Sequence, residues 1–416
     1  MITVKPDAKI AIVMPHQNKA LSMALQQATL EQLGQIQKGK DLKSIVHSLF
    51  QDKITDNKSN HVLLDILKTN SVFKQFGNFT DELKTLLTTL KSDPQIAPKL
   101  AKLETALKSI SALDVPALKG QIANSGVFME SKIASVLQPM QTIRQTLETL
   151  QQALSQSSHN EAKNLSQNLT ALLEHPVLEN AHEDSASARI LITTLRTLTD
   201  TIERILPKMD TLTPKETKLS QEIRTGAERL TPFTKPEQLL VQTQLEEKLG
   251  HDVKSSLMQL SEEIKSLNTP ISNEVQGQLD KLMTHIDYHQ LLSHLNGSNS
   301  LYFPFSWDQL EEGSLAFKKG TQNKFYCEIH LKLKEYGTLN LMMAMYDDHQ
   351  LEIHAYTEKS ALKERIQEHI STLRTLLKEA GITVKAIRVL ETKEAAIASA
   401  YTQEESDLHS GFEVKV

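Results

Sequence analysis

Residues 324–357 read KFYCEIHLKLKEYGTLNLMMAMYDDHQLEIHAYT and alternate apolar and polar side chains almost without interruption. Successive side chains of a β-strand point to opposite faces, so this period of two predicts half-buried strands. Gly337 and the Asp-Asp-His-Gln turn at 347–350 divide the stretch into three strands. The expected inward-facing residues are Phe325, Cys327, Ile329, Leu331 and Leu333, then Leu339, Leu341, Met343 and Met345, then Leu351, Ile353 and Ala355.

A helix and one more strand follow this stretch. Residues 358–380 carry apolar side chains at helical spacing, and Gly381 stands where a C-capping glycine belongs. The segment ITVKAIRVL, residues 382–390, predicts a last strand, and a strand–helix–strand step of this length suits a right-handed crossover within one sheet. We therefore expect a small α+β domain at 301–391, one β-sheet with one packed helix, in the order β-β-β-α-β. The expected buried stripe of the helix is Leu362, Ile366, Ile370, Leu373 and Leu377.

The preceding residues differ in composition from this domain. More than half of the aromatic residues lie between Tyr302 and Tyr356, whereas every proline lies at or before Pro304. Narrow leucine-rich stripes predict a mainly α, partly disordered N-terminal region whose helices pair as loose bundles or coiled coils, one of them restarting after Pro139. The stripes are Leu100, Leu103, Leu107 and Ile110; Ile143, Leu147, Leu150 and Leu154; Leu191, Leu195, Leu198, Ile202 and Ile205; and Leu245, Leu249, Val253, Leu257, Leu260 and Ile264.

These contrasts predict four regions along the chain. A polar helical, partly disordered region spans 1–120, and a helical, coiled-coil-like region with proline and glycine breaks spans 121–296. The compact domain at 301–391 follows, and residues 392–416 form a polar tail that we expect to be flexible.

Composition excludes several classes of function. A net charge of −5 gives no basic footprint for nucleic acid, and no stretch is apolar enough to predict stable membrane insertion. A single cysteine, Cys327, allows no intramolecular disulfide. The N-terminus has no continuous apolar h-region, so we expect no Sec signal peptide and synthesis in the cytoplasm.

Motifs for catalysis are missing from the sequence. It contains no G-x-G-x-x-G, Walker A or G-x-S-x-G pattern, so we predict a protein that is not an enzyme, with no cofactor, catalytic or metal site. His285 and His289 form an i, i+4 pair that could bind zinc, but the pattern is not H-E-x-x-H and no third ligand is identifiable. A packed or solvated helix face explains the pair better, and a metal hydrolase is the weakest alternative.

The strand, hairpin and helix pattern resembles the C-terminal domain of flagellar hook-length control proteins. The segment LKLKEYGTLNLMM, residues 331–343, and LLKEAGITVKAIRVL, residues 376–390, carry the resemblance. The matching positions are Leu331, Gly337, Leu339, Leu341, Leu377 and Gly381. Leu333 stands where proline is usual and Tyr336 where leucine is usual, so the loop before the second strand departs from the family pattern.

The resemblance implies a non-enzymatic export component. Members of the family leave the cell through the flagellar type III apparatus, and an extended N-terminal region acts as a ruler of hook length. The C-terminal domain then binds the export-gate switch protein, which changes export from hook to filament subunits. The resemblance therefore implies as partners this switch protein and the hook subunits or hook cap. Three hundred residues reach about 1000 Å fully extended or about 450 Å as helix. Either length is on the scale of tens of nanometres that a ruler requires.

Candidate contacts and rival functions follow from this reading. We expect partner-binding residues near the family glycine and in the aromatic segment 301–310, namely Tyr336, Gly337, Leu339, Leu341 and Trp307, although closing the core is the favoured role of the aromatic segment that contains Trp307. A coiled-coil scaffold or adaptor of the cell envelope is the alternative. A ruler should be a monomer and a scaffold a stable oligomer. The residues do not separate a flagellar protein from a virulence-needle regulator.

Overall fold

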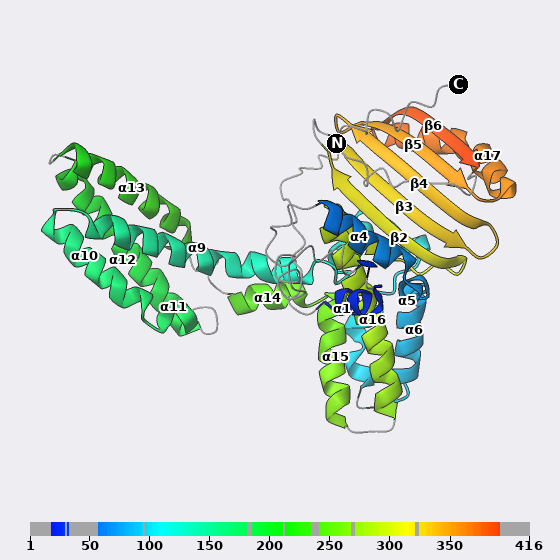
Figure 1. The fold of residues 1–416 in the computed structure, drawn as a ribbon, viewed down its shortest axis with the longest axis horizontal. Coiled ribbons are helices and arrows are strands. Elements are labelled where there is room, and N and C mark those ends of the chain that lie inside the picture. Colours follow the sequence, from blue (N-terminus) through cyan, green and yellow to red (C-terminus); the bar gives the residue numbers. More distant parts are fainter. Residues whose placement is uncertain are drawn as a thin grey trace. The chain divides into compact units, whose positions relative to one another are not determined.

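A computed structural model describes residues 18–29, 31–32, 57–94, 96–180, 185–210, 213–234, 241–267, 271–320 and 324–391. The chain divides into two compact units (Figure 1). Unit 1 comprises Met1–Ser131 and His251–Val416, and unit 2 comprises Lys132–Gly250. Unit 2 is thus an insertion within the sequence of unit 1. The four regions expected from composition stay predictions, and the tail at 392–416 lies outside the described residues.

Unit 2 is helical and has its own apolar core. It contains most of α9 (Met129–Ser155), then α10 (Asn160–Leu173), α11 (Val177–Asn180), α12 (Ser185–Met209), α13 (Pro214–Leu230), η3 (Thr231–Thr234) and α14 (Val241–Leu249). The predicted stripes at 143–154 and 191–205 are both buried in this core. Its buried members are Ile143, Leu147, Leu150, Ala153, Leu154, Ala162, Leu165, Leu169, Val177, Leu178, Leu191, Ile192, Leu195, Leu198, Ile202, Ile205, Leu206, Met209, Leu219, Ile223, Ala227 and Leu230.

The predicted helix restart after Pro139 is wrong, because α9 runs through the proline without ending. Val136 before the proline and Ile143 after it are both fully buried. Packing on one face therefore continues across the site and outweighs the hydrogen bond that a proline removes.

The helices of unit 1 come from both ends of the chain. They are α1 (Lys19–Gln27), α4 (Asn57–Thr69), α5 (Ser71–Lys74), α6 (Phe79–Leu90), η1 (Ala97–Lys99), α7 (Ala101–Glu104), η2 (Ile110–Ala112), α8 (Val115–Ala123), α15 (Val253–Leu267) and α16 (Ile271–Asn296). One core joins α6 to α15 and α16, and a second joins α1 and α4 to the C-terminal turns of α16. In the part of the chain that the structure describes, no helix is long and apolar enough to cross a membrane.

Two predicted stripes are interrupted in the structure. The stripe at 100–110 leaves helical geometry after α7, because the backbone N–H of Ile110 donates to the Ser306 carbonyl at 3.0 Å instead of continuing the helix. The stripe at 245–264 breaks between α14 and α15. There the Asp252 carboxylate accepts from the backbone N–H groups of Lys254 and Ser255, which starts a new helix.

Six strands form one mixed sheet in the order β1-β2-β3-β4-β5-β6. The strands are β1 (Asn299–Tyr302), β2 (Leu310–Lys319), β3 (Phe325–Leu333), β4 (Gly337–Tyr346), β5 (Gln350–Thr357) and β6 (Thr383–Glu391). Neighbours pair antiparallel from β1 to β5, whereas β6 is parallel to β5 and is reached through helix α17 (Ser360–Glu379). The crossover is confirmed, and the registers Ile329↔Leu341 and Leu341↔Ala355 place the predicted apolar residues on one face.

The predicted strand count before the helix was too low, because five strands precede α17 instead of three. The two additional strands, β1 and β2, lie within 299–319, for which the sequence analysis predicted no strand. Gly313 interrupts the apolar pattern of β2, and a Cβ at this position would lie 2.8 Å from the Cβ of Phe303. Gly313 is therefore explained by the close approach of Phe303, which leaves no room for a Cβ, and not by the alternation of apolar and polar residues.

The sheet has two apolar cores. Leu301, Tyr302 and Leu315 of β1 and β2 are buried together with residues of α6, α15 and α16. The other core lies around the start of α17 and contains Leu310, Leu331, Leu333, Leu339, Ala355 and Leu362. The sheet is therefore continuous with the helical part of unit 1.

Candidate partner-binding surface

The predicted partner-binding residues gather where β3, β4 and α17 meet. Leu339 is only 8% exposed and belongs to the core with Leu362. Trp307, Tyr336 and Leu341 are half-buried and pack against the same core. The structure thus brings the four side chains together, and their position gives each of them a role in packing.

Gly337 begins β4 in a conformation that favours glycine, with φ at +70°. A Cβ there would lie 2.5 Å from Oε2 of Glu358, which lies two residues before the start of α17. This carboxylate accepts a hydrogen bond from the Thr338 N–H at 2.7 Å, and this bond lowers the pKa of Glu358. The Arg365 guanidinium donates to the Tyr336 hydroxyl at 3.1 Å. These contacts fasten the N-terminal end of α17 to the β3–β4 turn, and a partner-binding role for the five residues stays a prediction.

His285 and His289 lie inside unit 1. The ring of His285 stacks on Phe76 at a centroid distance of 4.7 Å, and Nδ1 of His289 lies 3.1 Å from the Ser300 hydroxyl. Burial lowers the pKa of His285 to about 3 and holds that of His289 well below its usual range. Both imidazoles are packed, neutral core groups. The sequence left open a packed or a solvated helix face for the pair, and the structure shows the packed one.

Helix α17 is less covered toward its C-terminal end than at its start. Leu362 at the start of the helix is buried, Ile366 and Ile370 are half-buried, and Leu373 and Leu376 are 37% and 57% exposed. The predicted stripe is therefore buried only at Leu362 and stays partly covered as far as Leu377, which is half-buried, whereas Leu373 and, outside the stripe, Leu376 are open to solvent. Gly381 closes the helix with φ at +80°, as predicted, with Ile382 N–H donating to the Leu377 carbonyl at 2.8 Å.

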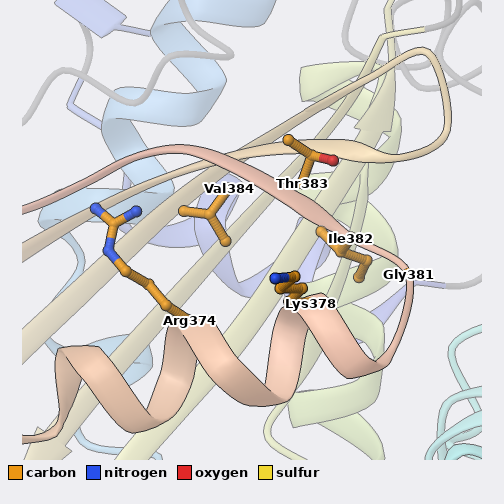
Figure 2. A pocket seen from close by; sticks show the side chains of 6 residues that line it. All are labelled: Arg374, Lys378, Gly381, Ile382, Thr383 and Val384. Atoms are coloured by element: carbon orange, nitrogen blue, oxygen red, sulfur yellow. The ribbon is translucent and has the colours of Figure 1, made fainter.

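A pocket of about 410 Å³ opens between this end of α17 and the beginning of β6 (Figure 2). Arg374 and Lys378 stand on the helix side, and Val384 points from the strand toward the helix while Thr383 points away. Gly381 and Ile382 complete the lining. The pocket thus combines two cationic heads with an apolar floor.

Sequence reasoning did not single out this surface. The signal was present in Arg374 and Lys378, which are four residues apart and so lie on one helix face. Their exposure could not be read from the sequence, because Leu373 and Leu377 continue the apolar stripe as if the helix were covered throughout.

Comparison with known proteins identifies this part of the chain. No curated protein and no solved structure matches the chain. Residues 314–396, however, match the family described as Flagellar hook-length control protein FliK. The match begins within β2 and includes β3 to β6 and α17. The family is one of non-enzymatic flagellar regulators, as the sequence predicted. Residues 314–396 of this chain are therefore a domain of the flagellar hook-length control family.

Proposed function

We propose that this protein is an exported ruler that controls flagellar hook length and switches export from hook to filament subunits. The observation that carries the proposal is the family match at 314–396. In this proposal the protein is made in the cytoplasm and leaves through the flagellar type III apparatus as a monomer. The matched domain binds the export-gate switch protein, while the preceding residues contact hook subunits or the hook cap.

The arrangement of the chain supports a long measuring segment ahead of the domain. More than 300 residues precede the match, and most of the described ones are helical. Unit 2 adds to this length without contributing to the core of unit 1, since its buried cluster contains only residues between 132 and 250. A segment of this kind can change in length without altering the domain that would act on the export gate.

The switching role is tested by hook length in a strain whose chromosomal copy stops after Ser300. We expect overlong hooks without filaments, because the strands β2 to β6 and α17 are lost. Immunoblots of cells and medium would show that the truncated chain is made and exported. Hooks of normal length that carry filaments would contradict the proposal and favour the scaffold alternative.

The measuring role is tested by removing unit 2. The segments that flank it are held together, since the Val253 N–H donates to the Asn124 carbonyl at 2.9 Å and Lys254 Nζ lies 2.6 Å from Glu130 Oε1. A short Gly-Ser linker between Ser131 and His251 therefore joins neighbouring points. We expect filamented cells with hooks shorter by about 180 Å if the segment spans the hook as helix, and by up to about 400 Å if it is extended. Unchanged hook length would contradict the ruler.

A coiled-coil scaffold requires apolar stripes that are free for other chains. The stripes of α9 and α12 are instead buried against each other and against α13 in the core of unit 2. Native mass of the full chain separates the alternatives, since the ruler should be a monomer and the scaffold a stable oligomer.

A further inference from the structure

The edge of the sheet beside the pocket combines three features of a strand-binding site. Strand β6 is the last in the order β1 to β6, so alternate backbone N–H and C=O groups along its nine residues have no strand partner in the described part of the chain. The pocket between α17 and β6 opens beside this edge. The apolar side of β6 is half-exposed at Val384, Ile387 and Val389.

The charge of this edge is opposite to that of the chain. The whole protein has a net charge of −5, yet residues 373–390 contain four cations and one acid, Glu379. Arg374 and Lys378 line the pocket, whereas Lys385 and Arg388 project from the other face of β6. Lys385 Nζ lies 4.7 Å from the centroid of the Tyr346 ring, which holds the ammonium over that face. Within residues 324–391 no carboxylate forms an ion pair with any of the four.

We propose that the β6 edge and the adjoining pocket bind an acidic, extended segment of a partner protein, which pairs with β6 as a seventh strand. Backbone hydrogen bonds to the open edge hold the segment, and alternate side chains give specificity. Apolar residues of the segment enter the pocket beside Ile382 and Val384, and carboxylates on its other face approach Lys385 and Arg388. A carboxylate at the mouth of the pocket reaches Arg374 or Lys378.

Charge selects this occupant over a second copy of the chain. Pairing two β6 edges would bring Lys385 and Arg388 of one molecule against the same cations of the other, and like charges in register oppose strand pairing. The same cations attract an acidic strand. The inference rests on the proposed function only in that a partner segment is expected at the matched domain, and its test uses a defined peptide instead of the switch protein.

The test measures binding of a short fluorescein-labelled peptide of alternating Glu and Val, with one Val replaced by Glu so that a carboxylate also stands on the pocket side, to the full-length protein by fluorescence anisotropy. We expect saturable binding that weakens at least about fivefold in Arg374→Glu/Lys378→Glu and again in Lys385→Glu/Arg388→Glu, because exposed charge pairs contribute up to about 1 kcal/mol each. A peptide of alternating Lys and Val should not bind. The same Glu-Val peptide N-methylated at alternate residues should bind weakly, because it cannot pair with the edge.

Two control variants locate the effect. Arg229→Glu makes one charge reversal, half the change of each double variant, on the exposed C-terminal turn of α13 in unit 2 and should leave affinity unchanged. Arg365→Glu makes it on α17 itself beside Tyr336, and a loss of affinity only there would move the site to the residues around Gly337. Absence of binding, equal binding of the Lys-Val or N-methylated peptide, or double variants that both bind as tightly as the parent protein would overturn the inference. The proposed function is judged separately, by hook length, so the failure of the inference can be told apart from the failure of the proposed function.

Discussion

The ammonium of Lys254 lies 2.9 Å from Oδ1 of Asp287, and both side chains are less than a tenth exposed. Glu130 adds a second carboxylate at 2.6 Å, and the Gln290 amide oxygen accepts from the same ammonium at 2.8 Å. Burial lowers the pKa of Lys254, but the attraction of Asp287 and Glu130 exceeds this effect and leaves the pKa raised. Lys254 is therefore charged and fully paired inside unit 1.

We expect Lys254→Ala to destabilise unit 1 by about 3–5 kcal/mol, because it leaves Asp287 and Glu130 buried without a counter-ion. Trp307 is the single tryptophan and lies in unit 1, so urea denaturation followed by its fluorescence reports this unit. Lys265→Ala breaks only the exposed pair with Glu262 and should have little effect on stability. Equal effects of the two changes would mean that the buried cluster is solvated.

Acid should destabilise unit 1 through His285. Its folded pKa of about 3 lies below the usual 6.5. Between these two pH values the imidazole binds a proton in the unfolded chain but stays neutral in the folded chain. The contribution of this neutral imidazole is complete above pH 6.5 and is lost progressively as the pH falls toward 3. At pH 5 the loss is about 2 kcal/mol.

The comparison of His285→Leu with the parent separates this effect from that of the carboxylates. Denaturation followed by Trp307 fluorescence between pH 7 and pH 4 should show a flatter pH dependence in the variant. His61→Leu removes an exposed histidine of α4 and should leave the pH dependence as it was. An unchanged slope in His285→Leu would show that the ring is not buried.

Gly126 should tolerate no side chain. Its φ is +86°, and a Cβ would lie 2.8 Å from both the backbone nitrogen and the Cβ of Lys254. We expect Gly126→Ala to cost about 2–4 kcal/mol from backbone strain and overpacking together. Gly277 lies in the interior of α16 with open space around it, so Gly277→Ala should stabilise unit 1 by about 0.5–1 kcal/mol. Thermal unfolding of both variants in parallel checks the opposite signs.

The elements that local pattern determines could be predicted from the sequence, and those that tertiary contacts determine could not. The alternation in β3, β4 and β5, the stripe of α17 and the cap at Gly381 are local signals, and the structure contains all of them. Strand β2 was missed because Gly313 and adjacent acidic residues hide its period. The helix expected around Ile110 was lost to a hydrogen bond with Ser306, almost two hundred residues away.

The candidate surface shows the same limit. Residues near the family glycine were expected to contact a partner. The structure places Leu339 in the core, and its partner role stays a prediction. The open end of α17 could not be foreseen, because an apolar stripe does not reveal how much of its length a sheet covers. The change in burial along α17, from Leu362 to Leu376, is a property of the packed domain alone.

The two ends of this helix and sheet should respond differently to mutation. Leu339→Ala removes a buried side chain and leaves a cavity, so we expect it to lower the stability of the domain by about 2–5 kcal/mol. Leu376→Ala removes an exposed side chain, and its effect should stay within about 0.5 kcal/mol. Leu339→Met conserves volume and should cost less than about 1.5 kcal/mol. If Leu339 acts only in the core, filament formation in these strains will follow the measured stability. Lost filaments in a stably folded Leu339→Met strain would instead show that Leu339 contacts a partner.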